Sequence, residues 1–94
     1  MNETERHLLR HFLATLAYRT QKALRDAPEE FAEFTPVAGV RTPHHLLSHM
    51  SDVLSFARAR AEDISYPLPN TDTFEEEQAR FFSILESLSD CLER

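Results

Sequence analysis

Residues 41–52 read Arg41-Thr42-Pro43-His44-His45-Leu46-Leu47-Ser48-His49-Met50-Ser51-Asp52, and this stretch decides the fold because it marks the start of a helix. Thr42 is a favourable N-cap residue, since its hydroxyl can accept a hydrogen bond from a backbone N–H of the first turn. Pro43 suits the first helical position, where its missing N–H leaves no hydrogen bond unmade. The stretch therefore predicts a helix over residues 43–62, to the end of its apolar period.

Three side chains that can bind metal follow one another along this helix. His45, His49 and Asp52 stand at positions i, i+4 and i+7, which lie on one side of a helix. Two imidazoles and a carboxylate are ligands that transition metals accept, so the spacing predicts a candidate metal site. Each residue also has an ordinary interpretation: His49 as a half-buried histidine on the bundle-facing edge, His45 as a surface residue and Asp52 as a solvated carboxylate or the hydrogen-bond partner of a ligand histidine.

Two further segments have the helical period, over residues 3–27 and 74–92. The first begins after Asn2, which is a good N-cap. The second begins after Thr73, which forms a T-x-x-E capping box with Glu76. Together with residues 43–62, these segments cover most of the chain, which has only one glycine. The pattern predicts an all-α helical bundle of three long amphipathic helices in a single domain over residues 1–94.

Prolines mark the connections between the predicted helices. Pro28 ends the first helix, because the residue before a proline avoids helical geometry. Residues 28–41 show no helical period and make a long connection for a compact bundle. Pro67 and Pro69 end the second helix and predict a stiff link to the third.

Composition excludes several classes of partner. The net charge is −6, and the chain has only one lysine, so neither nucleic-acid binding nor a polybasic membrane anchor is expected. No apolar run reaches membrane-spanning length, and the acidic N-terminus does not resemble a signal peptide. A single cysteine, Cys91, cannot form an intramolecular disulfide. We therefore expect a soluble cytoplasmic protein.

The second helix opens with the motif T-P-x-x-L-L-x-H-M-x-D. Before it comes an amphipathic helix, and after it comes the stretch Phe74-Glu75-Glu76-Glu77-Gln78-Ala79-Arg80-Phe81-Phe82. This arrangement resembles the DinB/YfiT-like superfamily over the whole chain. The resemblance implies a four-helix bundle that holds a divalent metal, zinc, nickel or iron, through three histidines. His49 matches the ligand of the second helix. The family's two other ligands come from an H-x-x-x-H pair in a last helix, which follows the third helix and has no counterpart up to Arg94.

Two function hypotheses follow from this resemblance and from the missing H-x-x-x-H pair. The first is a DinB-like metal-binding protein with His49 as a ligand, His45 and Asp52 as helpers and an unspecified small-molecule substrate. Its chemistry would be that of a thiol-dependent transferase or isomerase, or of a metal-dependent hydrolase. The second is a non-catalytic helical protein without metal, in which apolar faces pair between copies. The chain is either incomplete at its C-terminus or a short relative that replaces the fourth helix by self-association.

The apolar stripes are wide for a three-helix domain, and this predicts a homodimer. Residues expected at or near its interface are Phe12, Leu16, Phe81 and Leu85.

The other reactive residues receive structural interpretations. His44 is expected to point to the opposite side of the second helix from His49 and to be exposed. His7 and His11 form a second H-x-x-x-H pair, opposite the apolar stripe of the first helix, where any metal would be adventitious. Cys91 lies near the edge of an apolar face with no basic neighbour to activate it.

Overall fold

The structure is a computed structural model that describes residues 1–63, 65 and 70–93. It contains three α-helices, α1 (Glu3–Leu24), α2 (Pro43–Glu62) and α3 (Phe74–Glu93), and a short 3-10 helix, η1 (Glu29–Glu33). No β-strand occurs among these residues. The predicted all-α helical bundle is therefore confirmed. None of the described helices is long and apolar enough to cross a membrane.

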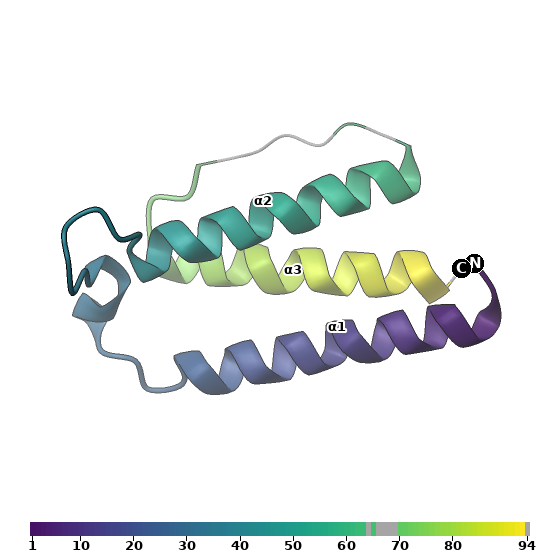
Figure 1. Cartoon of the computed structure of the whole chain (residues 1–94), viewed down its shortest axis with the longest axis horizontal. Coiled ribbons are helices and arrows are strands. Elements are labelled where there is room, and N and C mark those ends of the chain that lie inside the picture. Colours follow the sequence, from purple (N-terminus) through teal and green to yellow (C-terminus); the bar gives the residue numbers. More distant parts are fainter. Residues whose placement is uncertain (64, 66–69, 94) are drawn as a thin grey trace.

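Helix α3 lies in the middle of the bundle and packs against both other helices (Figure 1). Helix α1 runs antiparallel to α2 and α3, whereas α2 and α3 run parallel to each other, so the two chain termini lie at the same end (Figure 1). The η1 segment packs against α2 at the opposite end. This arrangement leaves α1 and α2 as the two flanks of a central helix.

Each helix begins where the sequence predicts, because each has an N-cap side chain. Asn2 accepts a hydrogen bond from the backbone N–H of Glu5 at 2.8 Å, and Thr42 accepts one from His45 at 3.0 Å. Thr73 and Glu76 form the reciprocal capping box: Thr73 Oγ1 accepts from the Glu76 N–H at 3.0 Å, and Glu76 Oε1 accepts from the Thr73 N–H at 3.1 Å.

The helix ends differ more from the predictions. Helix α1 stops at Leu24 rather than at residue 27, because Arg25 is already extended, with ψ 129°, and Asp26 after it is left-handed, with φ 60°. Helix α2 ends at Glu62 as predicted, and Asp63 caps it in the left-handed region. The predicted stiff link at Pro67 and Pro69 lies outside the described residues.

The core is small and is centred on α3. Leu47, Phe81 and Leu85 form its buried cluster, and side chains from all three α-helices pack around them. Phe81 is completely buried and Leu85 nearly so within one chain. The prediction that these two residues lie at a dimer interface is therefore wrong, because α1 and α2 already cover them. Leu16 is half-buried, and Phe12 stays exposed, as an interface residue would.

Replacing Phe81 by Ala should lower the free energy of unfolding by about 3–5 kcal/mol, because it leaves a cavity at the centre of the core. The measurement is urea unfolding followed by circular dichroism. Phe56→Ala is the matched control, since this phenylalanine is 64% exposed, and its effect should stay within about 0.5 kcal/mol. Equal effects of the two changes would contradict this description of the core.

Candidate functional site on the polar side of α2

A polar cleft of about 600 Å³ lies along α2 beside the loop that precedes it. It contains the three residues of the predicted metal set, His45, His49 and Asp52. The other residues that line it are Gly39, Val40, Arg41 and Ser48. The spacing in the sequence thus correctly predicts that the three side chains share one side of the helix, while their role as metal ligands stays a prediction.

The exposure of the histidines differs from the prediction. His49 is exposed, whereas the side chain of His44 is only 17% exposed, so the expected order is reversed. The reason is the rotation of α2 about its axis. The face that meets α3 is centred on Leu47, Ser51 and Ser55, all of them buried, and His44 lies on that face. The small serines allow α3 to approach closely, which a search for apolar stripes does not anticipate.

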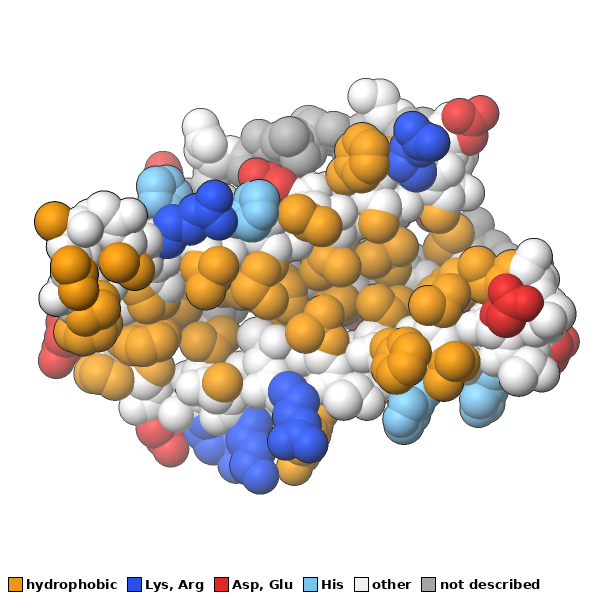
Figure 2. Space-filling model, in the orientation of Figure 1, with side chains coloured by type: hydrophobic (Ala, Val, Ile, Leu, Met, Phe, Trp, Pro, Cys, Tyr) orange, Lys and Arg blue, Asp and Glu red, His pale blue; other side chains and the backbone are white. Residues whose placement is uncertain are grey.

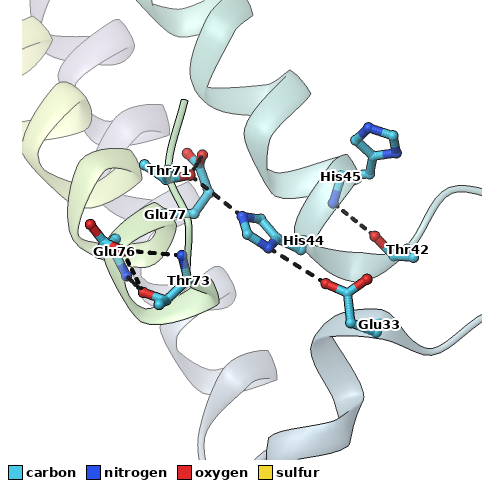
Figure 3. Close-up of polar contacts among 8 residues, drawn as sticks. All are labelled: Glu33, Thr42, His44, His45, Thr71, Thr73, Glu76 and Glu77. Carbon is cyan, nitrogen blue, oxygen red and sulfur yellow. Dashed lines mark hydrogen bonds and ion pairs between the residues drawn. The ribbon is translucent and has the colours of Figure 1, made fainter. Parts of the chain in front are cut away.

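His44 connects three segments of the chain (Figure 3). Its Nε2 lies 3.4 Å from Thr71 Oγ1, and its Nδ1 lies 3.7 Å from a carboxylate oxygen of Glu33 in η1. Its ring also meets the ring of Phe74 edge-on, with centroids 5.9 Å apart. The Thr71 hydroxyl donates its own hydrogen to Glu77, so its oxygen can accept a hydrogen bond from His44 Nε2.

The most deeply buried charge among the described residues is Glu77, which the sequence presents only as one of three acids in the first turn of α3. Its side chain is completely buried. Glu77 Oε1 accepts the Thr71 hydroxyl hydrogen at 2.5 Å, and both carboxylate oxygens lie 3.3 Å from Arg80 Nη1. The signal in the sequence is the i, i+3 spacing of Glu77 and Arg80, which brings opposite charges together on a helix.

Arg80 extends this network to α2. Its Nη2 donates to Asp52 Oδ1 at 2.6 Å, and its own side chain is only 10% exposed. Asp52 is therefore solvent-accessible, with 41% of its side chain exposed, but it is not free, because it forms an ion pair that joins α2 to α3. Because Arg80 engages one of its two oxygens, Asp52 has fewer lone pairs available to coordinate a metal than a free carboxylate would.

A second polar cleft, of about 530 Å³, adjoins the first at the start of α2. It is lined by Glu33, Thr42, His44, His45, Ser48, Asn70 and Thr71. His45 and Ser48 line both clefts, and the His45 side chain is exposed. The exposed imidazoles of His45 and His49 are thus the groups that a ligand in these clefts would meet, whereas His44 is already engaged.

Within the described part of the chain, no group of three or more His, Cys, Asp or Glu side chains is arranged to hold a metal ion. His45 and His49 supply two imidazoles to the cleft, and Asp52 lies beside them with one oxygen engaged by Arg80. His7 and His11 are exposed on α1, as predicted, and Cys91 is half-buried.

Comparisons with protein-family models, with curated proteins and with solved structures found no match. The resemblance to the DinB/YfiT-like superfamily therefore stays a prediction that rests on the residues of the second helix.

Replacing Glu77 by Gln should lower the free energy of unfolding by about 1–3 kcal/mol, because it removes the buried counter-charge of Arg80 and leaves Asp52 as the carboxylate paired with the guanidinium. Thermal and urea unfolding of the variant measure this loss. Glu86→Gln on the exposed side of the same helix is the control and should change stability little. A Glu77→Gln variant as stable as the control would show that the buried pair contributes nothing.

Proposed function

We propose that this chain is a non-catalytic helical protein that associates with a second copy through the apolar face between α1 and α2. We assign residues to this α1–α2 face from the helical period and from the pocket that Ala23, Leu46 and Met50 line between the two helices: Leu9, Phe12, Leu16, Ala23, Leu46, Met50, Val53 and Ala57. Hydrophobic side chains form a band along the middle of the molecule between the two helices (Figure 2). The observation that carries the proposal is that Phe12, Leu46 and Val53, three residues of the α1–α2 face, are 57%, 49% and 54% exposed.

The position of the face explains why it stays uncovered. Helices α1 and α2 both pack on α3, so their sides next to α3 are buried in α2 and partly buried in α1, while other apolar residues of both helices stay exposed. Contiguous apolar surface of this kind is uncommon on monomeric proteins and marks an interaction site. The resemblance noted above places a fourth helix over the same groove, which supports its assignment as an interface.

A second copy is the simplest partner for this face. In a two-fold dimer, one patch covers the same patch of the other molecule, so no additional surface is needed. Burial contributes about 2.5 kcal/mol for each 100 Å² of apolar surface before the entropy of association is subtracted. The net charge of −6 opposes association only weakly, because salt screens exposed charges within about 8 Å.

The absence of nucleic-acid partners and a cytoplasmic location remain predictions from composition.

A second candidate function is metal binding at the cleft of His45 and His49, in line with the DinB-like hypothesis. The observation that favours it is that both imidazoles line one cleft one helical turn apart, where they can bind the same ion. A zinc, nickel or iron ion held there would act as a Lewis acid on a substrate or on a thiol. The ion pair between Asp52 and Arg80 counts against a third ligand from Asp52.

Replacing Val53 by Asp should convert the dimer into a monomer, because it places a charge in the centre of the proposed interface. Sedimentation equilibrium at micromolar concentration gives the mass. The fold should persist, since Val53 is exposed in a single chain. Phe56→Asp, on the outer side of α2, is the control and should remain dimeric. A wild-type chain that sediments as a monomer would refute the proposed self-association.

For the second candidate, His49→Ala should abolish stoichiometric zinc binding, whereas His7→Ala should leave it intact. Isothermal titration of the purified, chelator-treated protein with zinc distinguishes the two. His7 and His11 form an exposed pair with the same spacing on α1, so they control for the affinity of any surface H-x-x-x-H pair. Loss of binding in the His7 variant alone would move the site to α1.

A further inference from the structure

The two halves of the α1–α2 face have opposite shapes. The half next to η1 contains an apolar pocket of about 310 Å³. Its lining residues are Arg19, Thr20, Ala23, Leu24, Phe31, Pro43, Leu46, Leu47, Met50 and Phe74. In the other half, the ring of Phe12 is 57% exposed, and Val53 on the facing helix is exposed as well. One surface thus carries both a hollow and a protruding aromatic side chain.

We infer that Phe12 of each copy inserts into the pocket of the other copy. This inference rests on the proposed homodimer and specifies how its two faces fit together. A two-fold axis that crosses the face between Phe12 and the pocket carries each half of the face onto the other half. Both contacts then form at once, and the two copies of α1 run antiparallel across the interface, with Leu16 close to the axis.

The chemistry of the pocket suits a phenyl ring. Apolar side chains form most of its lining, and Phe31 and Phe74 close one end with an edge-to-face contact at 6.2 Å between ring centroids. Arg19 is the charged residue of the lining, and a guanidinium group can lie favourably over an aromatic ring. A large ring that fills a pocket at the centre of an interface is the typical form of a binding hot spot.

The test uses two variants, one that removes the inserted Phe12 ring and one that blocks the pocket that receives it. Phe12→Ala removes the inserted ring, and Ala23→Trp fills the pocket while leaving Phe12 in place. Because each dimer contains two such contacts, either change should raise the dissociation constant of the dimer about 100-fold or more, measured by sedimentation equilibrium. Circular dichroism should show that both variants keep the helical fold, since both side chains are exposed in a single chain.

Mixing the two variants gives the decisive measurement. In a mixed dimer, Phe12 of the Ala23→Trp chain meets the open pocket of the Phe12→Ala chain, and the filled pocket meets only the small methyl group of the substituted alanine. The mixture should therefore form a heterodimer more tightly than either variant associates with itself. If the two variants stay monomeric when mixed, the proposed insertion of Phe12 into the pocket is refuted.

Tyr18→Ala is the matched control, because Tyr18 is also 57% exposed on α1 but lies outside the α1–α2 face. It should leave the dimer unchanged. If Phe12→Ala dimerises as well as Tyr18→Ala while Val53→Asp is monomeric, the insertion is refuted and the proposed dimer stands. A monomeric wild-type chain would refute both.

Discussion

The close contact between α2 and α3 determines in which direction the other side chains of α2 point. Ser51 and Ser55 are buried at this contact, where larger side chains would hold the two helices apart. Arg80 then reaches Asp52 on α2 and Glu77 on its own helix. Once α2 is fixed in this rotation, His44 turns inward, His49 turns outward, and Val53 faces the gap next to α1. The polar cleft and the apolar face therefore both follow from one helix–helix contact.

A buried charge at this contact requires a physical explanation, because removing a carboxylate from water is costly. Here the cost is offset by close partners: Thr71 donates a hydrogen bond to Glu77, and Arg80 provides the counter-charge. Such a network contributes less to stability than apolar packing of the same volume. Our hypothesis is that it contributes specificity instead, since a shift of α3 by one turn along α2 would separate Arg80 from Asp52, while Glu77 and Arg80 would stay paired on their own helix.

The sequence predicted the features that depend on local interactions. The start of α2 at Pro43 and its end at Glu62 follow from a cap, a proline and the apolar period, all within a few residues of each other. It failed where the outcome depends on packing between helices. The apolar stripe of residues 43–62 includes Leu46 and Val53, yet these stay exposed while two serines are buried. No periodicity of hydrophobic residues reveals that small polar side chains will be buried between two helices.

The same rotation separates the two candidate functions in space. His45 and His49 lie on the outer side of α2 with the cleft, whereas Leu46 and Val53 lie on the side that faces α1. A second copy on the apolar face would therefore leave both imidazoles accessible to an ion. Because the described part of one chain offers these two imidazoles to the cleft, a bound metal would complete its coordination with water or with groups from another molecule. The proposed self-association and the proposed metal binding would thus use different surfaces, and neither experiment decides the other.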